Sequence, residues 1–321
     1  MKKTLPVITA AILLLSCLNG CAGTGGTTEN VPSGDAKLQI ASTVFPTYDF
    51  AKQICGNTAE VTLLVPPGSE IHSFEPSAQD LIRIRNCDLF LYTGGESDSW
   101  VDDLLSSAGD GVKTIKMMDC VDTVAEEVVD GMTSGHEHEH EHEETAEYDE
   151  HVWTSPQNAM LIAEAITDAV CELSPGNKEF YQSNEEDYLA QLNSLDESFS
   201  DFFATVSNKT LIFGDRFPLR YFADEYGLTY YAAFPGCSTQ TEPSAATIAF
   251  LTDKVRREEI STVFYIEFSN HLVADSIAES TGARTAMFHA CHNVSPEELS
   301  EGVTYLSLMK QNLETLKKAM G

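Results

Sequence analysis

Short apolar runs rich in β-branched residues alternate along the chain with segments of helical period. In the first half, the strand-like runs are 37–45, 60–66, 88–95 and 112–119, and the helix-like segments are 48–56, 76–86 and 99–109. After residue 206 the alternation returns, with strand-like runs at 210–214, 229–234, 262–268 and 284–289 and helix-like segments at 219–227, 245–259, 272–282 and 304–320. Because strands that alternate with helices form mostly parallel sheets covered by helices, this order predicts an α/β fold.

Two helical segments separate these halves. The first is 155–173, with Ser155 as N-cap and Pro156 in the first turn. In the second, 177–206, large apolar side chains recur at helical spacing over nearly its whole length: Phe180, Tyr181, Tyr188, Leu192, Leu195, Phe199 and Phe202. We therefore predict two α/β lobes, an N-terminal lobe at 37–175 and a C-terminal lobe at 207–321, joined by one long rigid helix at 176–206.

The first residues have the pattern of an export signal. Lys2 and Lys3 precede an apolar stretch that ends at Leu18 and is too short for a membrane span. A small residue before Cys21 is typical of bacterial lipoproteins, so we expect a signal peptide at 1–20 and a lipid on Cys21. Cys17 is the alternative lipid acceptor, and a plain secretory signal is the alternative overall.

Cys21 is favoured because a Gly/Thr-rich polar stretch begins directly after it. Residues 21–36 would then be a flexible, lipidated tether that holds the lobes at a lipid bilayer.

Charge and cysteine spacing exclude several function classes. The net charge of −31 would repel phosphates and argues against nucleic acid as a partner. Beyond Cys21 the cysteines contain no C-x-x-C pair, which argues against zinc-knuckle and thioredoxin-like sites. Export permits disulfides, and we expect Cys237 to pair with Cys291 and Cys55 with Cys87.

Two histidines stand on loops where a ligand site is expected. His72 lies between a predicted strand and a predicted helix, in VPPGSEIHSFEPSAQD, and His151 lies just before a capped helix, in DEHVWTSPQN. Ligands of open parallel sheets bind beyond the carboxyl ends of the strands. Acceptors that could orient the two rings are Glu75, Asp149 and Glu150. Trp153 is positioned to shield such a site from water.

The two motifs PGSEIHSFEP and DEHVWTSP resemble those of the metal-binding solute-binding lipoproteins of bacterial ABC importers, the zinc/manganese class. The likeness covers essentially the whole chain after the tether: two lobes, a long connecting helix and a variable segment between the two histidines. The resemblance implies a tetrahedral or near-tetrahedral metal site in the cleft between the lobes, with His72 and His151 as its N-lobe ligands. It also implies a membrane ABC permease as partner.

The C-lobe departs from the pattern of this family. A family ligand stands ten residues before a Tyr-Gly pair, and that position is Arg216, whose guanidinium cannot ligate a cation. The last family ligand position aligns with His289. We expect His72, His151 and His289 as ligands, and the contenders for any remaining place are Asp215, Glu267 and His292. Arg216 would then pair with Asp215 or Glu242, and His271 is expected to be exposed.

Ligand chemistry favours Zn²⁺ as the bound ion. Imidazoles suit zinc, copper and nickel, whereas manganese prefers more carboxylate oxygen. The segment 126–148 carries a second set of histidines that alternates strictly with glutamates: His136, His138, His140 and His142. This tract has no apolar residue to bury, so we expect a mobile loop that captures zinc and passes it to the cleft. The alternative is a solvated polar loop that binds metal incidentally.

The function expected from these features is extracytoplasmic binding of zinc and its delivery to an ABC importer, without enzymatic activity. The alternatives are a binding protein for manganese or another divalent metal, a surface adhesin or zinc buffer without a permease, and a zinc-dependent hydrolase. The hydrolase is disfavoured because the chain contains no HExxH or similar helix motif.

Overall fold

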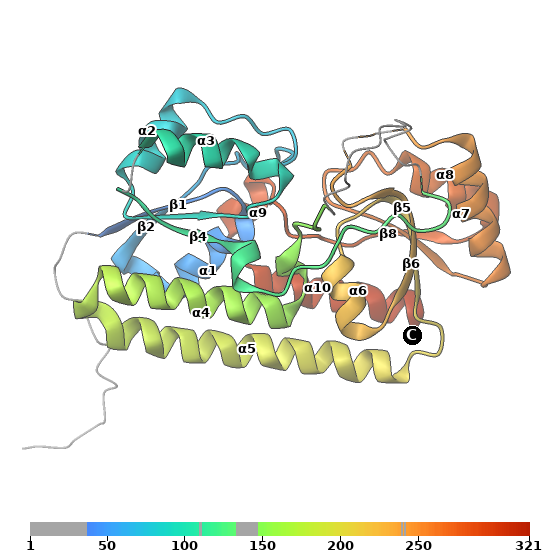
Figure 1. The fold of residues 1–321 in the computed structure, drawn as a ribbon. Coiled ribbons are helices and arrows are strands. Elements are labelled where there is room, and N and C mark those ends of the chain that lie inside the picture. Colours follow the sequence, from blue (N-terminus) through green and yellow to red (C-terminus); the bar gives the residue numbers. More distant parts are fainter. Residues whose placement is uncertain (1–36, 109–110, 133–146, 239, 241) are drawn as a thin grey trace, which may run out of the picture. The chain divides into compact units, whose positions relative to one another are not determined.

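Two four-stranded sheets, each parallel throughout, form the centres of the two lobes in the computed structural model (Figure 1). The structure describes residues 37–108, 111–132, 147–238, 240 and 242–321. The N-lobe sheet has the order β2-β1-β3-β4 and the C-lobe sheet the order β6-β5-β7-β8. The strands are β1 (Leu38–Ser42), β2 (Ala59–Leu63), β3 (Leu89–Tyr92), β4 (Lys113–Lys116), β5 (Thr210–Phe217), β6 (Thr229–Pro235), β7 (Thr262–Tyr265) and β8 (Arg284–Met287). The predicted α/β class is confirmed.

Helices follow the strands as the sequence pattern predicts. They are α1 (Phe45–Cys55), α2 (Ala78–Asn86), α3 (Ser99–Ala108), α4 (Pro156–Leu173), α5 (Lys178–Thr205), α6 (Arg220–Tyr226), α7 (Ala245–Arg257), α8 (Leu272–Thr281), α9 (Pro296–Glu301) and α10 (Tyr305–Met320). Ser155 caps α4 as expected, with its side chain accepting from Asn158 N at 3.0 Å. The short helix α9 was not predicted; Ser295 and Glu298 form a capping box at its start. Within the described residues, no helix is both long and apolar enough to cross a bilayer.

The long helix α5 connects the two lobes, as predicted. It contacts α1 and α4 of the N-lobe and α6 and α10 that follow it (Figure 1). Its buried face consists of Tyr181, Tyr188, Leu192, Leu195, Phe199 and Phe203. Phe203 takes the buried place predicted for Phe202. Because α5 packs against both lobes along one apolar stripe, this single helix supports both sheets.

Loops at the carboxyl ends of the strands from both lobes meet. Asn293, in the loop after β8, donates from its side chain to Pro66 O at 2.7 Å and to Ser69 O at 3.0 Å, in the loop after β2. At Gly214 in β5, an added Cβ would collide with the backbone of Ala274 in α8. Gly214 lies at a register shift between β5 and β6.

The predicted disulfides are absent among the described cysteines. Cys55, Cys87, Cys237 and Cys291 are all free, so both proposed pairings are wrong, and Cys120 and Cys171 are free as well. The thiols are satisfied locally instead: Cys87 donates to Ile84 O at 3.1 Å, one helical turn away. The lipid-acceptor candidates Cys17 and Cys21 lie outside the described residues, as do the tract histidines His136, His138, His140 and His142.

Candidate metal centre

Three histidines from distant parts of the chain converge at the junction of the lobes. One ring nitrogen each from His72, His151 and His292 lies within 4.8 Å of the others. The ring centroids are 5.5 Å apart for His72 and His151, 5.8 Å for His72 and His292, and 4.7 Å for His151 and His292. His72 follows β2, His151 precedes α4, and His292 follows β8.

His151 is fully buried and is oriented by Asp149. Its Nδ1 lies 2.9 Å from Asp149 Oδ1, and its backbone N–H donates to the same oxygen at 2.8 Å. A carboxylate oxygen can only accept, so Nδ1 carries the proton and the neutral ring presents a lone pair at Nε2. Burial favours the neutral ring, but the Asp149 carboxylate outweighs burial and raises the pKa of His151.

His72 is oriented by two residues, Ser97 and Glu150. Its Nδ1 lies 2.7 Å from Ser97 Oγ and 3.1 Å from Glu150 Oε1. Ser97 donates its own hydroxyl proton to Glu150, so its oxygen accepts from His72. Burial alone would raise the pKa of Glu150, but the hydrogen bond from His72 and the charges of His151 and His72 lower it to about 2. This carboxylate, and not the expected Glu75, therefore fixes the His72 ring.

His292 is oriented by Glu267. Its Nδ1 lies 3.2 Å from Glu267 Oε1, and Glu267 also accepts from the backbone N–H groups of Ala290 at 2.7 Å and His292 at 3.1 Å. Burial lowers the pKa of His292 to about 4; His151 adds to this effect and Glu267 opposes it. The ring is therefore neutral near pH 7, and its Nε2 carries a lone pair.

All three rings thus have the same arrangement, with a carboxylate at Nδ1 and a free Nε2. In the described part of the chain, the Nε2 atoms of His151 and His292 are buried without a hydrogen-bond partner, and so is that of His289, which lies outside this cluster. A buried imidazole nitrogen without a partner is costly unless an ion binds it. Carboxylates behind the ring nitrogens are typical of histidine metal sites, because they fix the tautomer and raise the basicity of the ligand nitrogen. The donor set fits Zn²⁺, which binds three histidines and one further ligand.

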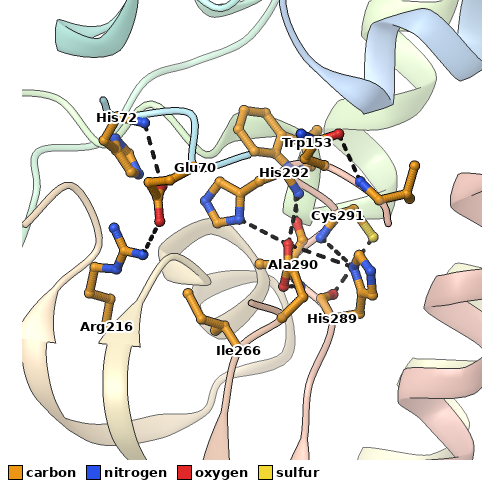
Figure 2. Close-up of polar contacts among 12 residues, drawn as sticks. Glu70, His72, Trp153, Arg216, Ile266, His289, Ala290, Cys291 and His292 are labelled. Carbon is orange, nitrogen blue, oxygen red and sulfur yellow. Dashed lines mark hydrogen bonds and ion pairs between the residues drawn. The ribbon is translucent and has the colours of Figure 1, made fainter. Parts of the chain in front are cut away.

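His289 does not join this group, contrary to the expectation from the sequence. Its Nδ1 accepts a hydrogen bond from Cys291 N at 3.0 Å, so in the neutral ring the proton is on Nε2. Its Nε2 is directed elsewhere, 4.0 Å from Glu298 Oε1, and Figure 2 shows the ring beside Cys291 and apart from His72. Cys291 has a φ of +63°, and this turn brings His292 rather than His289 to the junction.

The remaining contenders have structural partners of their own. Asp215 accepts from Arg216 N at 2.8 Å and from Ile266 N at 3.3 Å, and Glu267 orients His292. Arg216 pairs with Glu70, not with Asp215 or Glu242, and Figure 2 shows Glu70 between Arg216 and His72. His271 is exposed, as predicted, and its Nδ1 pairs with Asp275 at 2.8 Å.

Packing around the histidines keeps them in place. Trp153 is fully buried, its ring is 5.5 Å from those of His151 and His292, and its Nε1 donates to Ala290 O at 2.9 Å. The shielding role expected of Trp153 therefore agrees with its position. At Gly95, an added Cβ would collide with the Glu150 carboxylate, so a glycine is required where that carboxylate reaches His72.

A second group of metal-binding atoms shares His151. Ligand atoms of Glu150, His151 and Cys237 lie within 4.8 Å of one another. Both oxygens of Glu150 already accept hydrogen bonds from Ser97, and Asp149 occupies Nδ1 of His151. The cluster of His72, His151 and His292 is therefore the better metal site.

Sequence reasoning missed Ser97, Glu150 as the partner of His72, and Glu70 as the partner of Arg216. Adjacency in the sequence suggested Glu150 as a partner of His151. No sequence pattern links Glu150 to His72, which lies 78 positions earlier. Only the parallel sheet, which places the loops after β2 and β3 side by side with the segment before α4, could reveal these contacts.

A family model described as "Zinc-uptake complex component A periplasmic" matches residues 40–319. The chain belongs to this family. Its similar proteins include the high-affinity zinc uptake system protein ZnuA of Bacillus subtilis, which is 34% identical over 319 residues, covering 98% of this chain and 96% of that protein. The zinc-binding lipoprotein AdcA of Streptococcus pneumoniae is 33% identical over 293 residues, covering 90% of this chain and 57% of AdcA. The chain thus spans little more than half the length of AdcA.

Solved structures of similar proteins share the fold. The Zn(II)-bound ZnuA-like domain of Streptococcus pneumoniae AdcA is 31% identical, with a TM-score of 0.73, and the match covers 89% of this chain and 99% of that domain. The metal-dependent lipoprotein YcdH of Bacillus subtilis is 30% identical, with a TM-score of 0.75, and the match covers 89% of this chain and 100% of YcdH. The two parallel-sheet lobes and the long linking helix are therefore those of the family.

Proposed function

We propose that this protein binds Zn²⁺ outside the cytoplasm through His72, His151 and His292 and delivers it to an ABC importer. The observation that carries this proposal is the convergence of three imidazoles, each with a carboxylate or carboxylate-bound serine at Nδ1 and with Nε2 free for a cation. Membership of the zinc-uptake family and the names of the zinc-binding relatives support the choice of ion and the role in uptake.

The donor set favours zinc over manganese. Three neutral nitrogen donors suit zinc and its neighbours in the Irving–Williams series, whereas manganese sites contain more oxygen. The carboxylates of Asp149, Glu150 and Glu267 contact the Nδ1 atoms of the rings, so they would act on a bound ion through the imidazoles. In the neutral form of each ring the proton is on Nδ1, so zinc would bind at Nε2; because the pKa of His151 is raised, binding would release a proton from that ring where it is protonated.

The remaining assignments follow from the family and from the sequence. The lipid on Cys21 would hold residues 21–36 as a tether at the membrane, where the lobes can reach an ABC permease. The histidines at 136–142 would collect zinc with mobile ligands and pass it to the junction of the lobes. A solute-binding component carries its ion unchanged, so we assign no catalytic activity to the chain.

Zinc titration of the mature chain tests the proposal. Competition with a chromophoric chelator should show one tight Zn²⁺ site in the junction and much weaker binding of Mn²⁺, and His72→Ala should abolish the tight site. In cells starved of zinc, deletion of the gene should reduce zinc uptake, and the wild-type protein should restore it while His72→Ala does not. Tighter binding of Mn²⁺ than of Zn²⁺, or normal zinc affinity in His72→Ala, would contradict the proposal.

A further inference from the structure

Beside the three histidines lies a cavity that the binding of a metal ion alone does not explain. It has a volume of about 390 Å³ and is lined by Glu70 and His72 of the N-lobe and by Arg216, Gln240, Ser269 and Asn270 of the C-lobe. We propose that this cavity holds a small organic carboxylate that completes the coordination of the bound zinc, so that the transported species is a zinc–carboxylate complex. This inference rests on the proposed zinc-binding function.

The size of the cavity exceeds what an ion and its water need. One water molecule has a share of about 30 Å³ in the liquid, whereas pockets that bind small molecules measure roughly 300–1,000 Å³. His72, one of the three candidate ligands, belongs to the wall of the cavity. A molecule in the cavity is therefore next to the metal cluster and can offer an oxygen to the ion.

Arg216 gives the cavity a site for a carboxylate. Its side chain is 17% exposed; Nη2 pairs with Glu70 and Nη1 donates to Ser238 O at 3.3 Å. A guanidinium has five N–H donors, so these two contacts with described residues leave donors for a further anion. Arginine binds carboxylates through paired N–H groups, which makes it a selective anchor rather than a general positive charge.

The other walls favour an organic anion over a bare inorganic one. Apolar surface is contributed by Phe234, Phe268 and Val273, and amide and hydroxyl groups by Gln240, Asn270 and Ser269. Phe268 has a φ of +59° and is 46% exposed. A bulky residue in the left-handed region is strained, and such strain concentrates at ligand sites. A small chelator with a carbon skeleton and several oxygens matches these walls.

Coordination chemistry supplies the reason for binding such a molecule. Three histidines leave one of the four usual zinc positions to another ligand. The imidazole ligands are neutral and the carboxylates of Asp149, Glu150 and Glu267 lie behind the rings, so none of them fills the fourth position. Glu70 is paired with Arg216. A carboxylate in the cavity would fill the fourth position, contact the Arg216 donors that Glu70 and Ser238 leave, and remain shielded by the cavity walls.

The proposal is tested by asking whether citrate, malonate or acetate raises or lowers the affinity of the protein for zinc. In solution a chelator competes with the protein for zinc, so free Zn²⁺ must be fixed with a metal buffer. At fixed free zinc, we expect at least one probe to lower the apparent Kd of the full mature chain for Zn²⁺ by about tenfold or more, a typical size for coupling between two ligands. By reciprocity, the same probe should bind the zinc-loaded protein more tightly than the metal-free protein.

Variants then locate the effect. Arg216→Gln should abolish the gain in zinc affinity that the probe gives, and Asn270→Asp, which adds a negative charge to the wall, should reduce it. Arg220→Gln is the matched control, because Arg220 pairs with Glu127 and Asp224 outside the cavity, and it should retain the full gain. For each variant, the readout is the ratio of the Kd for Zn²⁺ without the probe to the Kd for Zn²⁺ with it. This ratio separates the effect of the probe from any change in zinc affinity caused by the substitution itself.

The outcomes distinguish this inference from the proposed function. If zinc binds tightly but none of the probes raises its affinity at fixed free zinc, the carboxylate proposal is overturned and the zinc proposal stands. A gain that persists in Arg216→Gln overturns the assignment of the anion to this cavity. A mature chain that binds no zinc, with or without a probe, overturns the proposed function itself.

Discussion

The imidazole rings of His151 and His292 lie 4.7 Å apart between centroids and are inclined at 82°. One belongs to the N-lobe and the other to the C-lobe, so an ion bound by both would connect the lobes directly. The Trp153 ring lies beside both of them, and its Nε1 donates to the backbone of the segment that carries His292. Zinc binding and the docking of the two lobes are therefore expected to stabilise each other.

Replacing His292 should remove a ligand, whereas replacing His289 should not. We expect His292→Ala to weaken zinc binding by more than about 100-fold, because even residues that only orient a ligand commonly contribute 10- to 100-fold. His289→Ala should change zinc affinity much less and should mainly lower stability, since His289 is buried and accepts from Cys291 N. Zinc competition titrations and thermal melts of both variants are the measurements; equal losses of zinc affinity would contradict the assignment of His292.

Removal of Asp149 should loosen the His151 ring without removing a ligand. We expect Asp149→Ala to lower zinc affinity by roughly 10- to 100-fold, because Nδ1 of His151 loses the acceptor that fixes its tautomer. Asp275→Ala is a matched control, since Asp275 makes the same contact with Nδ1 of the exposed His271 at 2.8 Å. Isothermal titration with zinc should show no change in the control, and an unchanged affinity in Asp149→Ala would show that the carboxylate is unimportant.

Zinc binding should be visible in the fluorescence of Trp153. The chain contains two tryptophans, and the Trp153 ring lies 5.5 Å from the rings of His151 and His292, whereas Trp100 packs on Phe74 and Phe90. Zinc should change the emission of the wild type and of Trp100→Phe but not that of Trp153→Phe. A zinc-dependent signal that remains in Trp153→Phe would show that the ion binds elsewhere.

Glu225 should make stability fall as pH rises. Burial, together with the neighbouring Asp196 carboxylate, raises the pKa of Glu225 from 4.5 to about 8. The folded state therefore holds this proton more tightly than the unfolded state, and its contribution is complete below pH 4.5 and is lost as pH rises toward 8. Glu225→Gln should flatten the dependence of the unfolding free energy on pH in this window, measured by urea denaturation at a series of pH values. Parallel curves for the two proteins would contradict the shifted pKa.

Deletion of residues 134–147 should impair the capture of zinc by the tract without changing tight zinc binding at the junction of the lobes. The four tract histidines lie in this stretch, whereas His72, His151 and His292 lie outside it. We expect the deletion to leave the tight zinc site unchanged, to remove the weaker zinc equivalents in a titration, and to slow uptake when zinc is scarce. Normal uptake under scarcity would leave the tract without a role in transport.

The fold was largely predictable because its pattern is local. Strand and helix periods, the Ser155 cap and the stripe on α5 each depend on residues close in sequence, and each is present in the structure. The loops of His72 and His151 were also predictable, because a parallel sheet brings the carboxyl ends of its strands together.

The third histidine could not be chosen from sequence, because His289 and His292 lie in the same loop. The choice depends on the positive φ of Cys291 and on which ring nitrogen accepts a backbone proton. The pairing of Arg216 with Glu70 was unpredictable for a different reason: it joins residues of different lobes that are 146 positions apart in the sequence.

The free thiols have a practical consequence. None of the cysteines that the structure describes is cross-linked, so the fold of the two lobes depends on apolar packing and hydrogen bonds. The protein should therefore refold and keep its melting temperature in the presence of strong reductants.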